Sequence, residues 1–64
     1  MTPSELRRVC EFLNDHRKAG GQTELARRLG WNISTVRRKL SGFTRISRAD
    51  ELAIRAAVPD FTWP

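Results

Sequence analysis

The stretch from Gln22 to Ser41 constrains this chain most, because it can fold as two short helices joined by a tight turn. Gly30 is placed to end the first helix, since glycine adopts the left-handed conformation needed just past a helix terminus at little cost. Asn32 can cap the second helix by accepting a hydrogen bond from an unpaired backbone N–H. We therefore predict helices over about 22–29 and about 33–40.

The apolar residues of this stretch identify its inner face. Leu25, Ala26 and Leu29 fall at i, i+1 and i+4 in the first helix, and Val36 and Leu40 fall at i, i+4 in the second. Ala26 is small where the two helices would cross most closely. The polar residues on the opposite side of the second helix then point outward: Ser34, Arg37, Arg38 and Ser41.

This arrangement resembles the helix-turn-helix of the lambda-repressor/Cro superfamily of phage and bacterial regulators. The matching positions are the opening glutamine, the inner alanine, the turn glycine, the apolar residue after it and the inward aliphatic: Gln22, Ala26, Gly30, Trp31 and Val36. The close match covers about twenty residues. The resemblance implies sequence-specific DNA binding, with the second helix in the major groove and its N-terminal residues on base edges.

The segment Thr2–Glu5 can start an N-terminal helix through a threonine cap, a proline at the first position and a glutamate that completes a capping box. This helix is expected to end near His16 or Arg17, and the glycine-containing segment 18–21 is expected to be a flexible turn. The apolar residues of its buried stripe repeat at i, i+3, i+4 and i+7: Leu6, Val9, Cys10 and Leu13.

Ser47 is predicted to cap a last helix, with Asp50 as its acidic partner and Pro59 at its end. On a neighbouring face of this helix we expect Ile54 and Val58. The residues expected to form its buried stripe are Leu52, Ala53 and Ala56, flanked by Ala49.

The chain shows no β-strand pattern, so the predicted fold is all-α: a compact, lambda-repressor-like bundle of four short helices. Residues 1–58 are predicted to form the helix-turn-helix DNA-binding domain, and 59–64 a short tail. In the connection before the last helix, Phe43 and Ile46 are expected to fold back on the core.

Charge favours a polyanionic partner, because the net charge is +5 and the sequence pI is about 11.1. A basic run can also be a solvated face, yet beside a helix-turn-helix it favours nucleic acid. The window from Leu25 to Ala49 holds seven basic residues and no acidic one; the seven are Arg27, Arg28, Arg37, Arg38, Lys39, Arg45 and Arg48.

The resemblance implies that the base-reading residues are Ile33, Ser34, Arg37 and Arg38. An arginine fork pairs with O6 and N7 of guanine, so we predict a guanine contact from Arg37 or Arg38, with phosphate contact alone as the alternative. Ile33 stands where the family usually has a polar residue; it either touches a thymine methyl or packs toward Val36. The predicted contacts to the DNA backbone are Gln22, Thr23, Asn32, Thr35, Lys39, Ser41, Arg45 and Arg48.

Several residues also have a structural interpretation. Asn32 suits a cap better than a base contact, and Thr23 suits a cap as well as a phosphate contact. Lys39 stands where the family often has an apolar residue, so its stem can lie along apolar surface. Trp31 is expected in the core rather than as a stacking platform, and Cys10 as an inert buried residue.

One reading helix contacts too few base pairs to select a site among roughly a million to a billion competitors. We therefore expect a homodimer on an inverted-repeat operator, with reading helices about 34–36 Å apart. Phe61 and Trp63 can alternatively fold onto their own core. The predicted dimer interface comprises Ile54, Val58, Phe61 and Trp63.

No enzyme is expected, because the sequence has no nucleophile–base–acid set, no phosphate loop and no metal-ligand cluster. The single cysteine excludes an internal disulfide. We expect no cofactor, no metal, no small-molecule effector and no membrane partner, and a cytoplasmic location.

The expected function is a transcriptional repressor that acts by occupying its operator. The resemblance implies a relation to small phage or mobile-element repressors, including Cro-like proteins and autorepressors of anti-CRISPR operons. Alternatives are a DNA-architectural or excisionase-like protein, a phage packaging accessory protein, and a protein-binding module on a helix-turn-helix shell.

Overall fold

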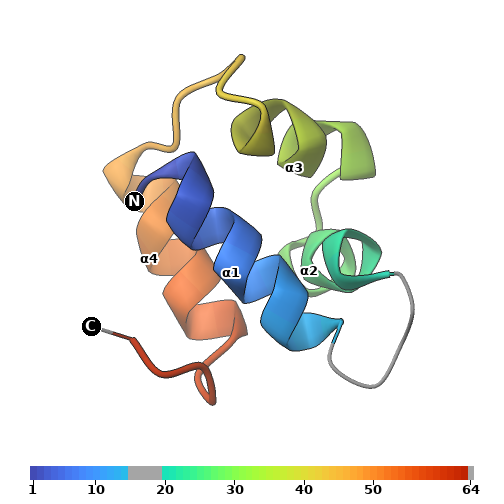
Figure 1. Ribbon diagram of the computed structural model, residues 1–64, viewed down its shortest axis with the longest axis vertical. Coiled ribbons are helices and arrows are strands. Elements are labelled where there is room, and N and C mark those ends of the chain that lie inside the picture. Colours follow the sequence, from blue (N-terminus) through green and yellow to red (C-terminus); the bar gives the residue numbers. More distant parts are fainter. Residues whose placement is uncertain (15–19, 64) are drawn as a thin grey trace.

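The computed structural model describes residues 1–14 and 20–63, which form four helices (Figure 1). These are α1 (Pro3–Leu13), α2 (Gly21–Leu29), α3 (Ile33–Leu40) and α4 (Arg48–Ala57). The described residues contain no strand, so the all-α prediction of four short helices is confirmed. α2 contacts each of the other three helices, and α1 also contacts α3. No described helix is long and apolar enough to cross a membrane.

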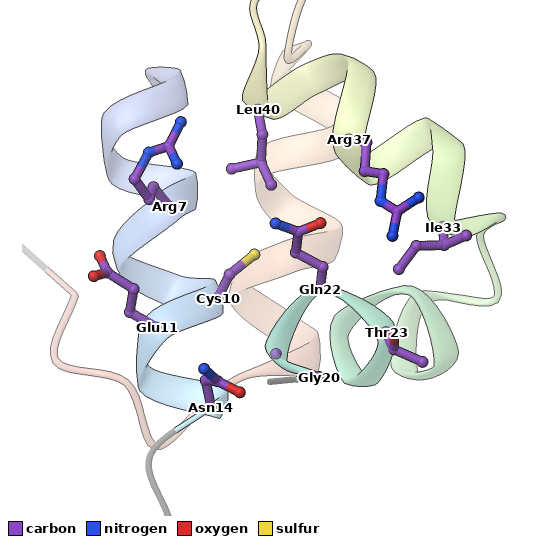
Figure 2. Close-up of a pocket in the computed structure, with 11 residues that line it drawn as sticks. Arg7, Cys10, Glu11, Asn14, Gly20, Gln22, Thr23, Ile33, Arg37 and Leu40 are labelled. Atoms are coloured by element: carbon purple, nitrogen blue, oxygen red, sulfur yellow. The ribbon is translucent and has the colours of Figure 1, made fainter. Parts of the chain in front are cut away.

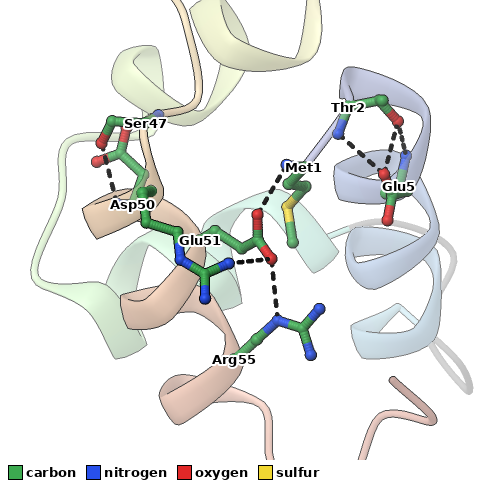
Figure 3. Close-up of polar contacts among 8 residues, drawn as sticks. Met1, Thr2, Glu5, Ser47, Asp50, Glu51 and Arg55 are labelled. Carbon is green, nitrogen blue, oxygen red and sulfur yellow. Dashed lines mark hydrogen bonds and ion pairs between the residues drawn. The ribbon is translucent and has the colours of Figure 1, made fainter. Parts of the chain in front are cut away.

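The predicted capping boxes form at the starts of α1 and α4. At α1 the Thr2 hydroxyl accepts from the Glu5 N–H at 3.2 Å, and the Glu5 carboxylate accepts from the Thr2 N–H at 3.1 Å (Figure 3). At α4 the corresponding pair is Ser47 and Asp50. Each box gives an acceptor to two backbone N–H groups, which have no partner within the helix.

The described part of α1 runs to Leu13, and the N–H of Asn14 bonds to the Cys10 carbonyl at 3.0 Å. The predicted end at His16 or Arg17 lies outside the described residues, as does part of the predicted turn 18–21.

The turn between α2 and α3 has the predicted glycine geometry. Gly30 has φ +71°, and the N–H groups of Gly30 and Trp31 bond to the carbonyls of Arg27 and Ala26 at 3.3 and 2.9 Å. These two bonds form a Schellman motif, which satisfies carbonyls that the helix end would otherwise leave free. The helix bounds predicted for residues 33–40 are correct at both ends.

The core forms where the sequence predicts it for the first three helices. Trp31 is half-buried and packs against this core, as expected. Burial raises the pKa of the Cys10 thiol to about 11, which fits an unreactive side chain. The buried apolar residues are Leu6, Val9, Cys10, Leu25, Ala26, Val36, Leu40, Ile46, Ile54 and Val58.

The predicted buried face of α4 is wrong. Leu52 is 53% exposed and Ala53 and Ala56 are exposed, whereas Ile54 and Val58 are fully buried. Burying the two β-branched side chains removes more apolar area from water than burying two alanines would. The fold therefore turns Ile54 and Val58 inward, and neither is available to a second copy of the chain.

Gly21 belongs to a close helix contact rather than to the flexible turn that we expected. It is the first residue of α2 and is buried against α1. A Cβ at this position would overlap the carbonyl oxygen of Cys10. The two backbones can approach this closely only because residue 21 has no side chain.

The connection between α3 and α4 buries one of its two large apolar residues and exposes the other. Ile46 is buried at 9% exposure, as predicted, but Phe43 is 80% exposed. The backbone hydrogen bonds at the end of α3 hold residue 43 outside the bundle, because Gly42 adopts φ +80° and the Phe43 N–H bonds to the Arg38 carbonyl at 2.9 Å.

The C-terminal tail folds back on its own chain. The Phe61 ring lies edge-to-face with Phe12, with centroids 5.4 Å apart, and 4.7 Å from the Trp63 ring. The Trp63 indole N–H donates to the Val58 carbonyl at 3.0 Å. Phe61 and Trp63 are thus half-buried against their own core, the alternative weighed for them above.

Candidate nucleic-acid interface

α3 exposes most of the outward polar stripe that the sequence predicts, although Ser34 is half-buried. Val36 is fully buried and Leu40 is 7% exposed, which fixes the rotation of the helix about its axis. On the opposite side Arg37 and Arg38 are exposed, as is Ser41 just past the helix end. The two guanidinium groups of α3 therefore face solvent, away from the core.

The ends of α3 are fixed by side-chain hydrogen bonds. The Asn32 carbonyl oxygen accepts from the Ser34 N–H at 3.0 Å and from the Ser34 hydroxyl at 2.9 Å. At the other end the Ser41 hydroxyl donates to the Arg38 carbonyl at 3.0 Å. Asn32 is thus a helix cap, the role preferred for it over base reading.

The basic residues of the window 25–49 divide into paired and unpaired groups. Arg27 and Arg28 both bind Glu24, at 2.8 and 2.9 Å, and these hydrogen bonds lower the pKa of the Glu24 carboxyl. Arg48 lies 3.5 Å from Glu51. Within 1–14 and 20–63, no ion pair involves the remaining arginines of this window: Arg37, Arg38 and Arg45.

Lys39 is directed inward, against our prediction of a phosphate contact. Its ammonium lies 2.8 Å from Asp50, donates to the Arg45 carbonyl at 3.0 Å and sits 5.5 Å from the centre of the Trp31 ring. Its side chain is only 12% exposed. The charge that the sequence assigned to the DNA backbone therefore joins α3 to α4.

A groove of about 480 Å³ opens beside the arginines of α3, between that helix, α1 and the start of α2 (Figure 2). Gln22 and Thr23 line it from α2, and Ile33 and Arg37 line it from α3. Ile33 is half-buried at the rim and is not among the residues packed on the core. The structure thus brings four of the predicted site residues together.

The start of α2 adds backbone donors to this groove. The helix begins after Gly20 without a side-chain cap, so Thr23 does not have the capping role considered for it. The N–H groups of a first helical turn lack partners within the helix and attract anions. The groove can therefore hold an anion such as a phosphate beside Ile33 and Arg37, two of the residues predicted to read bases.

Arg7 of α1 also lines this groove, and the sequence analysis did not identify it as a site residue. Figure 2 shows its guanidinium on the α1 side, across the groove from Arg37. The carboxylate of Glu11 lies on the same wall and partly offsets this charge. Only the tertiary contact between α1 and α3 brings Arg7 here, so no local pattern could indicate it.

The remaining predicted backbone contacts lie on α3 or follow it in the chain. Thr35 is half-buried on α3, whereas Arg45 and Arg48 are exposed after it. Of the other predicted group, the dimer contacts, Ile54 and Val58 lie in the core. The predicted site residues outside the tail and the core therefore lie on α2, on α3, in the connections on either side of α3 and at the first residue of α4.

The family model described as the IclR helix-turn-helix domain matches residues 8–47, which is more than half of the chain. The matched segment contains all of α2 and α3. No curated protein and no solved structure matches this sequence. The helix-turn-helix assignment is confirmed, while the matching family is not the lambda-repressor/Cro superfamily that residues 22–41 resemble.

Proposed function

We propose that this chain represses transcription as a homodimer on an inverted-repeat operator. The chain belongs to the IclR helix-turn-helix domain family and is thus a helix-turn-helix DNA-binding regulator. The observation that carries this proposal is the exposure of Arg37 and Arg38 on α3, opposite the buried Val36 and Leu40. Two exposed cations on the second helix of such a unit suit the major groove.

In this proposal α3 lies in the major groove and reads bases. Its eight residues span about 12 Å, which is about the width of that groove. Arg37 or Arg38 pairs with a guanine, while Ser34 and Ile33 approach neighbouring base edges from the first turn. Ile33 at the groove rim suits contact with a thymine methyl.

The phosphates on either side of the reading helix are held by two groups. Gln22 and Thr23 act with the backbone of the α2 start, and Thr35, Ser41, Arg45 and Arg48 act beyond α3. Lys39 leaves this set because its ammonium is bound to Asp50 and its side chain is only 12% exposed, and Asn32 leaves it as the cap of α3. Ser41 and Arg48 also have partners within the protein, but both side chains are exposed. These contacts set the register of the protein without reading sequence.

The homodimer is proposed because a single reading helix cannot select one site in a genome. Since Ile54 and Val58 are buried, the remaining candidates for the dimer contact are the partly exposed Phe61 and Trp63 of the tail 59–64. Repression then follows from occupancy of the operator.

Selection of bound duplexes from a randomised DNA library tests this function. We expect enrichment of an inverted repeat with half-sites about one helical turn apart, and sedimentation of two chains per duplex. Absence of any binding at low salt would leave a protein-binding module on the same shell. Strong bending with weak sequence preference would instead indicate an architectural protein.

Arg37→Ala and Arg38→Ala give the residue-level prediction. We expect at least one of them to weaken binding to the selected duplex by about ten- to a hundred-fold, corresponding to roughly 1–3 kcal/mol for a guanine contact. Binding to random DNA should fall much less. Fluorescence anisotropy titrations over a range of salt concentrations measure both affinities.

Arg8→Ala is the matched control, because it removes the same charge from an exposed site on α1 that faces the tail. It should reduce binding to selected and random DNA equally and only slightly, and sedimentation must show that it still dimerises, because Arg8 lines a pocket with Phe61 and Trp63. If both α3 variants behave like this control, the arginines contact phosphates alone and the base-reading role is wrong.

A further inference from the structure

Phe43 is held away from the protein by hydrogen bonds rather than by packing. It follows Gly42 in the Schellman motif that ends α3, where its N–H bonds to the Arg38 carbonyl at 2.9 Å. In such motifs the residue at this position usually packs an apolar side chain back on the helix. Here the ring is 80% exposed, more than any other large apolar side chain in the described chain.

The surroundings of Phe43 match a polyanion. Arg38 and Ser41 precede it on α3 and Arg45 follows it, and all three are exposed. No acidic residue occurs between positions 25 and 49. Figure 1 shows this connection projecting from the bundle at the end where α3 lies. The aromatic ring is therefore continuous with the surface assigned to DNA.

We propose that Phe43 packs against the flank of the DNA half-site and makes recognition depend on how easily that flank deforms. This inference rests on the proposed function. With the first turn of α3 on base edges, the end of an approximately 12 Å helix reaches the edge of the major groove. A side chain three residues further on meets the sugar–phosphate strand and the minor groove beyond it.

Phenylalanine suits this position because the deoxyribose faces and an opened base step are the apolar surfaces that a duplex offers there. Apolar wedges of this kind partly unstack a step and bend the duplex. Pyrimidine–purine steps unstack easily and A-tracts resist, so the ring favours the first kind of flank. Arg45, two residues on, can hold the adjacent phosphate and fix the depth of contact.

The test compares wild type, Phe43→Ala and Phe43→Leu on duplexes selected by the wild type, with the flanking step set to CA/TG or to an A-tract. We expect Phe43→Ala to bind the CA/TG duplex about ten-fold more weakly. It should lose the preference between flanks and bend the duplex less in a gel-phasing assay. Phe43→Leu should retain part of both effects.

Leu52→Ala is the control for loss of an exposed apolar side chain, since Leu52 is 53% exposed on α4 and is not among the proposed DNA contacts. It should bind both duplexes as wild type does. Thermal melts should show that both alanine variants remain folded.

Three results would overturn the inference in different ways. Equal affinity and bending of wild type and Phe43→Ala would remove Phe43 from the DNA contact while leaving the proposed function standing. A loss of sedimenting mass in free Phe43→Ala would make the ring a self-association contact. If the wild type binds no duplex at all, the proposed function itself fails.

Discussion

α3 and α4 use their charges in opposite ways. α3 exposes Arg37 and Arg38 without a carboxylate partner in the described residues. On α4, Asp50 binds Lys39, and Glu51 binds the amino group of Met1 at 2.8 Å and Arg55 at 3.2 Å (Figure 3).

This comparison shows how a chain with net charge +5 can direct its field toward one face. Among the described residues, Glu24 binds arginines of its own helix and Asp50 binds Lys39, whereas no described carboxylate pairs with Arg37, Arg38 or Arg45 on and after α3. These charges attract a polyanion to the α3 side of the protein, and Arg7 adds to them across the groove.

The largest expected change is in the free energy of unfolding when core packing at α4 is removed. Ile54→Ala removes a fully buried side chain and should lower the free energy of unfolding by about 2–5 kcal/mol. Leu52→Ala should change it by less than about 0.5 kcal/mol. Urea denaturation followed by circular dichroism measures both variants.

Because 64 residues give only marginal stability, Ile54→Ala can unfold outright. Ile54→Val, with an expected loss of about 0.5–1.5 kcal/mol, then keeps the comparison measurable. A larger loss for Leu52→Ala than for the Ile54 variants would mean that α4 packs through the face predicted from sequence.

The same two helices show what the sequence could and could not predict. α3 has two strongly apolar inner residues, Val36 and Leu40, between an asparagine cap and a glycine stop, so its bounds and its inner face both follow. α4 has equally clear ends, but apolar residues occur on every side of it. Periodicity alone could not decide which of its faces is buried.

The features missed in the candidate site all depend on contacts between distant segments. Arg7 reaches the groove only because α1 packs on α3, and Lys39 pairs with Asp50 across eleven positions. Gly21 is required by the proximity of the Cys10 backbone. Local patterns indicate helices and caps, whereas these contacts follow from how the helices pack.

A change of intermediate size in stability should come from Lys39, the basic residue of α3 that is paired with a carboxylate of α4. Lys39→Met keeps the aliphatic stem and removes the ammonium from Asp50 and from the Arg45 carbonyl. We expect a loss of about 0.5–1 kcal/mol in the free energy of unfolding, because the pair is partly exposed. DNA affinity should fall less than in Arg38→Ala.

Lys39→Met should thus mainly lower stability and Arg38→Ala should mainly lower DNA affinity, which distinguishes a charge that joins helices from a charge that binds DNA. Denaturation and anisotropy titrations on the same samples give stability and affinity together. Unchanged stability with a large loss of affinity would show that Lys39 leaves Asp50 and contacts phosphate in the complex.

The smallest effect is the pH dependence of Asp50. Its hydrogen bond with Lys39 lowers the pKa of the carboxyl below the usual 3.8 in the folded protein, so the ionised form stabilises the fold at pH values above 3.8. This contribution should decline as the pH falls through the lowered pKa, where the folded protein also takes up the proton.

Asp50→Asn keeps an acceptor for the Ser47 N–H but lacks the charge. It should be less stable than wild type by a few tenths of a kcal/mol at pH 7 and nearly equal at about pH 2. Arg38→Ala, which has no described carboxylate partner, should show no such convergence. A constant difference between wild type and Asp50→Asn across this range would mean that the Lys39 pair does not stabilise the α3–α4 connection.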